Sequence, residues 1–72
     1  MNKTKAILMH LQDKGNITTW EAIQEYGATR LSAIIYRLRH EYGLNIVSED
    51  IAFTDRFGKS ASYVKYILVK EQ

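Results

Sequence analysis

The sequence of 72 residues contains no cysteine and no proline, and it shows no long hydrophobic run. Without cysteine no disulfide can form, and no cluster of cysteines and histidines is available to bind a structural zinc ion. A chain this short makes a single domain, residues 1–72, which buries about 60% of its extended-chain surface. With 46% hydrophobic and 25% charged residues, its composition is that of a folded globular protein.

Several function classes are excluded on the same grounds. The apolar stretch at residues 6–9 follows two lysines, but it is interrupted from His10 onward and is too short for a signal peptide or a membrane span. We therefore expect a cytoplasmic protein without a membrane partner. The sequence has no cysteine nucleophile, no glycine-rich phosphate loop and no Ser/His/Asp set at recognisable spacing. We expect no enzyme, no small-molecule substrate, no metal and no cofactor.

The first helix is predicted at about residues 3–14. Ile7, Leu8 and Leu11 have the spacing of one helix face, and Gly15 follows a lysine in the last turn. Glycine commonly ends a helix because it enters the left-handed backbone region at little cost.

A second, shorter helix is predicted at about residues 19–26, ending at Gly27. Thr18 and Glu21 have the spacing of a capping box, in which the side chain of each accepts a hydrogen bond from the backbone N–H of the other. The extended residues 16–18 could add a third short strand to a sheet.

The clearest periodicity belongs to a third helix, predicted from a cap at Thr29 to about residue 42 and closed by Gly43. Its apolar stripe consists of Leu31, Ile34, Ile35, Leu38 and Tyr42. We expect this stripe to face the core, with Trp20 packed between the second and third helices. The opposite face carries Ala33, Tyr36 and His40, flanked by Arg30, Ser32, Arg37 and Arg39.

From residue 44 the hydrophobic period changes from helical to alternating. Residues 44–53 and 62–69 are rich in Ile, Val, Tyr and Phe and are predicted to form two strands. The polar, glycine-containing residues 54–61 between them form a hairpin loop. In the second strand, we expect Val64, Tyr66 and Leu68 to pack on the helices.

The order of these elements predicts a winged helix-turn-helix fold, mainly α with a β-hairpin. A tight turn at residues 27–29 joins a short helix to a longer one, as in the motif whose second helix enters the DNA major groove. The two-stranded hairpin beyond it is the wing.

The positive charge of the chain is concentrated on the proposed recognition helix. The formal charge is +2, and residues 27–43 hold three arginines against one glutamate, whereas the charges on either side cancel. Arginine can bind guanine, or a phosphate, through two hydrogen bonds at once. We therefore expect double-stranded DNA as the partner.

The candidate DNA-binding residues lie on the outward face of the third helix and in the hairpin loop. Arg30 and Arg37 can contact bases or phosphates, and Thr29 can contact phosphate beside the free N–H groups of the helix start. Ser32 and Ala33 are small enough for the helix to approach base edges. The loop cations can reach the DNA backbone or minor groove. The full set is Thr29, Arg30, Ser32, Ala33, Tyr36, Arg37, His40, Arg56 and Lys59.

Other roles stay open for individual residues. Arg37 also has the i, i+4 spacing to pair with Glu41. Arg39 lies further round the helix, where contact with phosphate and plain solvation are equally compatible with its position. Tyr36 could pack against the wing instead of DNA.

Three ordered motifs span most of the chain. Residues 27–31 read Gly-Ala-Thr-Arg-Leu, residues 35–39 read Ile-Tyr-Arg-Leu-Arg, and residues 63–68 end the strand pair as Y-x-x-Y-x-L. Over about residues 5–69 the sequence resembles a family of small helix-turn-helix domains encoded by bacteriophages and prophages. The resemblance implies a winged helix that binds DNA, as a transcriptional regulator or an excisionase-like factor.

Two expectations concern protein partners. A single small module neutralises few phosphates, so we expect a homodimer or a cooperative array on DNA, joined by exposed apolar residues such as Phe53, Phe57, Ile67 and Val69. The alternative function is a protein-interaction module, in which a small phage protein uses the apolar wing to bind a host protein.

Overall fold

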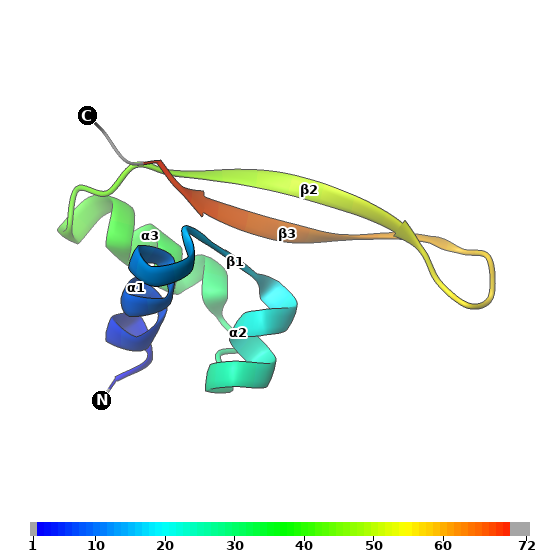
Figure 1. The fold of residues 1–72 in the computed structure, drawn as a ribbon, viewed down its shortest axis with the longest axis horizontal. Helices are drawn as coiled ribbons and strands as arrows, with labels where there is room; N and C mark the ends of the chain where they lie inside the picture. The colour runs from blue at the N-terminus through cyan, green and yellow to red at the C-terminus, as the bar shows by residue number, and fades with distance from the viewer. Residues whose placement is uncertain (1, 70–72) are drawn as a thin grey trace.

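The computed structural model describes residues 2–69, and its elements follow the predicted order (Figure 1). The helices are α1 (Lys3–Lys14), α2 (Thr19–Tyr26) and α3 (Leu31–Glu41), and the strands are β1 (Asn16–Thr18), β2 (Ile46–Thr54) and β3 (Ser60–Leu68). The strands form an antiparallel sheet in the order β1-β3-β2, so the short strand at residues 16–18 is confirmed. The helices lie on one side of the sheet, and the β2–β3 hairpin extends beyond them along the 40 Å long axis.

The local signals at α2 fix the helix-turn-helix geometry. The capping box is confirmed: Thr18 Oγ1 accepts from the backbone N–H of Glu21 at 3.1 Å, and Glu21 Oε1 accepts from the N–H of Thr18 at 3.0 Å. At the other end Gly27 adopts φ 62°, which a residue with a β-carbon adopts only under strain. The N–H of Ala28 then donates to the carbonyl of Ala22 at 3.0 Å and closes the turn.

The start of α3 differs from the prediction. Arg30, not Thr29, occupies the N-cap position, with φ −118° and ψ 54°, and no side chain caps the helix. The prediction that Thr29 caps α3 is therefore wrong. Leu31 begins the helix and is buried, so the chain enters α3 through burial of an apolar side chain rather than through a capping hydrogen bond.

The core is built mainly from the three helices. The predicted stripe is confirmed for Leu31, Ile34, Ile35 and Leu38, while the sheet adds Ile17 and Ile46. The rest of the buried set is Ile7, Leu11, Ala22 and Ala28.

Two aromatic residues expected in the interior are exposed. Tyr42 is 52% exposed. α3 ends at Glu41, so Tyr42 is no longer held in the helix that would direct its side chain toward the core. Trp20 is 61% exposed, so the prediction that it packs between α2 and α3 is wrong. On α2 the core-facing position belongs to Ala22, and Trp20 lies two residues away, which places it on another side of the helix.

The hairpin loop is shorter than predicted, and β2 begins at Ile46, two residues later than predicted. The β2–β3 register runs from the Ile46–Leu68 pair to the Thr54–Ser60 pair, which leaves residues 55–59 as the loop. Asp55 shortens the loop because its Oδ1 accepts from the N–H groups of Phe57 at 2.8 Å and Lys59 at 3.0 Å. The predicted inward face of the second strand is confirmed for Tyr66 and Leu68, which pack against the core.

Candidate nucleic-acid interface

The outward face of α3 is a solvent-exposed surface made mostly of polar residues. Its predicted members Ser32, Ala33, Tyr36, Arg37 and His40 are all exposed, since the apolar stripe on the opposite side of the helix is held in the core. The rings of Tyr36 and His40 lie one turn apart with centroids separated by 4.2 Å and planes tilted by 37°. This tilted pair places an aromatic contact with polar edges in the middle of the face.

The three arginines of the helix have different environments. Arg30 is exposed at the start of α3, and residues 2–69 provide it with no hydrogen bond or ion pair. Arg37 Nε lies 3.5 Å from Glu41 Oε2, and both side chains are more than half exposed. Such a pair in water contributes little stability and separates easily. Both guanidinium groups are therefore accessible to a partner.

Arg39 has a structural role that the sequence did not reveal. Its Nε and Nη2 donate to the carbonyl oxygen of Ile46 at 2.9 and 2.6 Å. β2 is an edge strand, and this carbonyl, at the first residue of β2, lies on the side of the strand that is not paired with β3. Arg39 therefore fixes the point where β2 leaves the helical body, and its charge is directed away from the outward face of α3.

The turn before α3 is exposed and tied to α1. Thr29 remains exposed beside Arg30, although it does not cap the helix. Lys3 Nζ donates to the carbonyl oxygen of Gly27 at 3.0 Å, which links the first turn of α1 to the helix-turn-helix turn. Thr29 and Arg30 thus continue the surface of α3 toward its N-terminus.

The second candidate surface is the tip of the hairpin. Arg56 and Lys59 are exposed in a loop where the N–H of Asp55 donates to the carbonyl of Lys59 at 2.9 Å and the N–H of Gly58 donates to that of Asp55 at 3.0 Å. Within the loop, these two hydrogen bonds enclose a three-residue turn at residues 56–58, whose third residue, Gly58, adopts the left-handed conformation with φ 80°. The two cations are therefore presented on an ordered turn.

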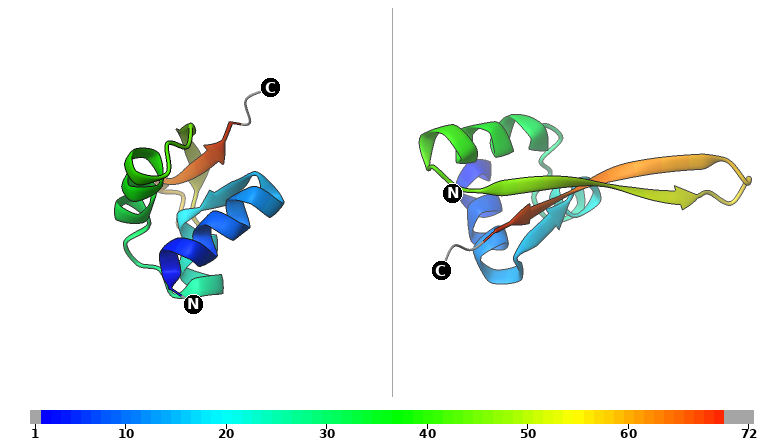
Figure 2. Two further views of the ribbon diagram at one scale, coloured as in Figure 1. Left: turned by 90° about the vertical axis from the view of Figure 1, so that its left-hand side faces the viewer. Right: turned by 90° about the horizontal axis from the view of Figure 1, so that it is seen from above.

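The predicted residues form two groups rather than one patch. One group covers α3 and the preceding turn, and the other lies at the distal end of the hairpin, well beyond the helices (Figure 2). A partner that meets both groups must be extended. Double-stranded DNA has this shape, because successive grooves and phosphates continue along its axis.

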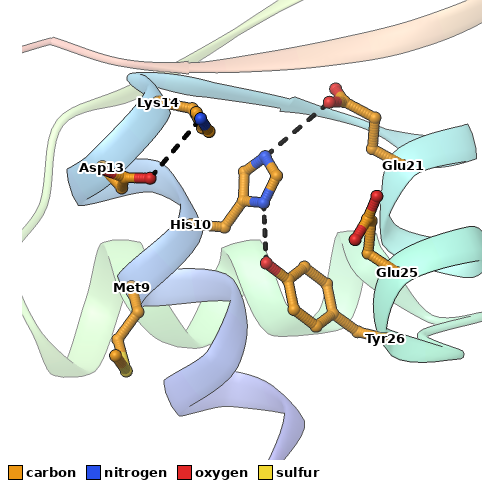
Figure 3. A pocket seen from close by; sticks show the side chains of 7 residues that line it. All are labelled: Met9, His10, Asp13, Lys14, Glu21, Glu25 and Tyr26. Atoms are coloured by element: carbon orange, nitrogen blue, oxygen red, sulfur yellow. Dashed lines mark hydrogen bonds and ion pairs between the residues drawn. The ribbon is translucent and has the colours of Figure 1, made fainter.

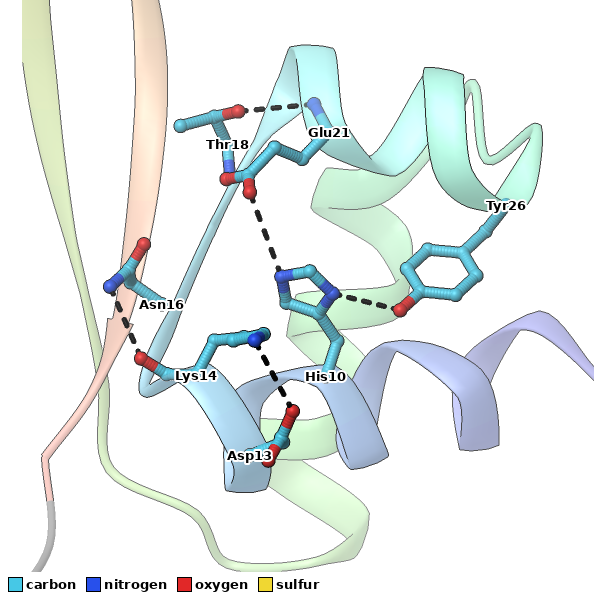
Figure 4. A network of polar contacts seen from close by, with 7 residues as sticks. All are labelled: His10, Asp13, Lys14, Asn16, Thr18, Glu21 and Tyr26. Atoms are coloured by element: carbon cyan, nitrogen blue, oxygen red, sulfur yellow. Dashed lines mark hydrogen bonds and ion pairs between the residues drawn. The ribbon is translucent and has the colours of Figure 1, made fainter.

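A polar cluster between α1 and α2 was not predicted. His10 Nδ1 and the Tyr26 hydroxyl lie 2.8 Å apart, and the two rings meet edge to face (Figure 4). The histidine side chain is 9% exposed, and its Nε2 lies 3.8 Å from Glu21 Oε2. Glu21 is eleven residues from His10 in the sequence and approaches it only because α2 folds back on α1.

This cluster lines an open pocket of about 580 Å³ that also includes Met9, Asp13, Lys14 and Glu25 (Figure 3). Glu21 belongs at the same time to the capping box of α2, so the histidine is joined to the network that starts the helix. Across residues 2–69, no group of three or more His, Cys, Asp or Glu side chains is arranged to hold a metal ion. The contacts of His10 with Tyr26 and Glu21 connect α1 to α2.

Comparison with known protein families agrees with this architecture. A family model described as a winged helix-turn-helix domain matches residues 2–71. The chain belongs to this family. Comparisons with curated proteins and with solved structures gave no match.

Family membership confirms the fold predicted from the order of elements. In this winged helix, α2 and α3 form the helix-turn-helix and the β2–β3 hairpin forms the wing. A winged helix-turn-helix domain implies DNA binding, and such domains are typically non-enzymatic. Among residues 2–69, no helix has the length and apolar character needed to cross a bilayer.

Proposed function

We propose that this winged helix binds double-stranded DNA sequence-specifically, with α3 in the major groove and the wing on the flanking backbone. The observation that supports this most directly is the exposure of Arg30 and Arg37, which flank the outward face of α3. Among the helix arginines, Arg39 bonds to the protein backbone, while these two keep their guanidinium groups toward solvent.

The individual contacts follow from side-chain chemistry. The arginines can donate to guanine or to phosphate in pairs of hydrogen bonds, and the small residues Ser32 and Ala33 allow the helix backbone to approach base edges. Thr29, Tyr36 and His40 extend the surface toward the phosphates on either side. Arg56 and Lys59 at the wing tip add contacts that fix orientation without reading sequence.

The biological role we propose is that of a phage or prophage protein, acting in the bacterial cytoplasm as a transcriptional regulator or an excisionase-like factor. The support is the ordered set of motifs at residues 27–31, 35–39 and 63–68. Selection of bound sequences from a random duplex library, followed by mapping of the selected site beside phage promoters or attachment sites, separates the two roles.

The direct test compares the wild type with an Arg30→Ala, Arg37→Ala double variant. A labelled duplex carrying the selected site is titrated with each protein at several salt concentrations. Each lost base contact costs about 1–3 kcal/mol, and each lost phosphate contact lowers the salt slope by about one. We therefore expect at least about a tenfold loss of affinity.

The matched control is a Lys5→Ala, Lys14→Ala double variant, which removes the same charge from the exposed surface of α1. If charge alone governs binding, the two double variants lose affinity equally. If the α3 surface reads DNA, the α1 variant keeps most of its affinity. Absence of wild-type binding at low salt, or equal binding by the wild type and the arginine variant, contradicts the proposal.

A second candidate function is supported by one observation. Phe57 is 81% exposed at the wing tip, and exposed aromatic residues are frequent anchors of protein interfaces. In a protein-interaction module of this kind, Phe57→Ala abolishes capture of a host protein, whereas the two arginine substitutions leave it unchanged. The DNA-binding function predicts the reverse dependence.

A further inference from the structure

The wing has an apolar face that points away from the helices of its own chain. Ile46, Tyr66 and Leu68 pack on the core, so the strand residues that alternate with them point to the opposite side. We call this the outer sheet face. It consists of Val47, Glu49, Ile51 and Phe53 on β2 and Ala61, Tyr63, Lys65 and Ile67 on β3.

In the distal hairpin, which extends beyond the helices, the apolar residues lie mainly on the outer sheet face. A sheet covered on one side normally places apolar residues toward its own core and polar residues toward water. Here the other face, which continues the helix-facing side of the sheet, carries Ser48, Asp50, Ala52, Thr54, Ser60 and Ser62. Its large apolar side chains are limited to Val64 and, at the base, Ile46, Tyr66 and Leu68. The other large apolar residues of the two strands occupy the outer sheet face, where the Phe53 and Tyr63 rings lie 5.8 Å apart.

Nothing in the described chain covers this face. In Figure 1 the helices lie below the hairpin, and none of residues 2–69 forms an element above it. Val47 is 43% exposed and Phe53 is 44% exposed. Apolar side chains gathered on one partly exposed face in this way mark a site of association.

The charges on the outer sheet face indicate which partner can bind it. The register pairs Val47 with Ile67, Glu49 with Lys65, Ile51 with Tyr63, and Phe53 with Ala61. Glu49 and Lys65 are thus direct neighbours near the middle of the strip, yet they do not form an ion pair within the described chain. One positive and one negative charge side by side make a pattern that is complementary to itself.

Consider a second copy placed face to face by a two-fold axis parallel to the strands. This axis exchanges β2 and β3 across the interface, so Glu49 of one copy meets Lys65 of the other, and the reverse. In the same arrangement Phe53 meets the small Ala61, and Ile51 meets Tyr63. A two-fold axis perpendicular to the strands at the centre of the strip would instead place Glu49 against Ile51 and Lys65 against Tyr63, so neither charge would meet a partner and the parallel axis is favoured.

We infer that the outer sheet face binds a second copy of this chain, with the two wings side by side and parallel. Nine residues per strand and two strands give a strip about 30 Å long and about 10 Å wide. With side-chain relief, two copies bury roughly 1,000 Å² in total, which is the low end for a specific interface. The dimer therefore forms at micromolar concentrations or on a shared ligand.

This dimer goes beyond the proposed DNA-binding function. The outer sheet face contains none of the residues that we propose for DNA contact, and the helices of both copies lie on the outside of the paired wings. A two-fold dimer that also binds DNA reads an inverted repeat. That consequence rests on the proposed function, but the association itself does not.

The test uses sedimentation velocity without DNA, on the full chain from about 10 μM to about 1 mM. Glu49→Lys leaves two lysines on the strip and Lys65→Glu leaves two acidic residues, so each variant repels its own copy. We expect each to raise the dimer Kd at least about tenfold. In an equimolar mixture each lysine meets an acidic residue of the other variant, and the dimer returns as a heterodimer.

Controls separate association from folding. Asp50→Lys makes the same charge reversal one residue along β2, on the side that faces the helices, and leaves the dimer unchanged. Circular dichroism reports whether each variant is folded, and the double variant Glu49→Lys, Lys65→Glu restores the homodimer. Recovery in the mixture also excludes simple unfolding.

Three outcomes overturn the inference. The wild type could remain monomeric at the highest concentration, the single reversals could leave the dimer intact, or the mixture could fail to recover it. The last two indicate a different interface, such as pairing of two β2 edges, in which Lys65 takes no part. DNA binding is measured separately with the arginine variants, so failure of the dimer leaves the proposed function standing.

Discussion

The helical body and the distal hairpin of this winged helix are stabilised in different ways. The body contains the buried core, to which the sheet contributes Ile17 and Ile46 near the base of the hairpin. The hairpin has no fully buried side chain from residue 47 to residue 68, and only at its base do Tyr66 and Leu68 pack against the core. It relies on its hydrogen-bonded ladder, cross-strand contacts and the turn held by Asp55.

This contrast separates stability from recognition along the chain. Burial of apolar side chains is the main favourable contribution to folding, so the body determines whether the chain folds. The hairpin residues are largely free of this requirement, and their side chains can be chosen for a partner. Substitutions in the two regions should therefore differ sharply in their effect on the free energy of unfolding.

The largest effect is expected from Leu38→Ala compared with Phe57→Ala. Leu38 is fully buried, and its truncation leaves a cavity that lowers the free energy of unfolding by about 2–5 kcal/mol. Phe57 is mostly exposed, so its truncation changes this free energy by less than about 0.5 kcal/mol. Urea denaturation followed by circular dichroism measures both values. Similar losses for the two variants would show that the hairpin tip contributes to the folded core.

The sequence predicted the local features of the body, for physical reasons. The stripe of α3, the capping box of α2 and the glycine helix ends depend on neighbours within a turn or two of the same helix. These short-range relations can be read from residue spacing. The exposure of the predicted α3 surface followed from the same stripe.

The relations that were missed depend on the tertiary arrangement. Arg39 can donate to the Ile46 carbonyl only after β2 has turned back along α3. His10 approaches Glu21 only after α2 has folded beside α1. The inward placement expected for Trp20 failed because a large aromatic side chain was assumed to be buried, whereas Ala22 fills the core-facing position of α2. Residue spacing alone carries no signal for these contacts.

The junction between the two regions is tested by Arg39→Ala. The substitution removes two donors from the Ile46 carbonyl where β2 begins. Hydrogen bonds from a charged group contribute somewhat more than neutral ones, and we expect a loss of about 1–2 kcal/mol in the free energy of unfolding. Arg39→Lys is the control, because it keeps the charge but cannot present two adjacent donors, and an intermediate loss is expected. If both variants match the wild type, the wing is held to the body by packing alone.

A smaller effect distinguishes the two local turn devices, one in each region. Thr18→Ala removes the side-chain acceptor that begins α2 and lowers the free energy of unfolding by about 1 kcal/mol. Asp55→Ala removes the acceptor for Phe57 and Lys59 at the wing tip. Because the tip is remote from the core, we expect this variant to lose less global stability than Thr18→Ala while amide exchange at the tip accelerates. Equal global losses would contradict the separation of the two regions.

The smallest stability effect should accompany a clear change in binding. Glu41→Gln breaks the exposed ion pair with Arg37, in which the basic residue precedes the acidic one along the helix, the less favourable order. We therefore expect the free energy of unfolding to change by no more than about 0.3 kcal/mol. The substitution also frees Arg37 and removes a negative charge from the helix proposed to approach DNA, so affinity for a duplex at low salt should rise severalfold. The same substitution in an Arg37→Ala background tests the cause. If the gain persists there in full, it comes from the general repulsion of phosphate by Glu41 rather than from release of the arginine.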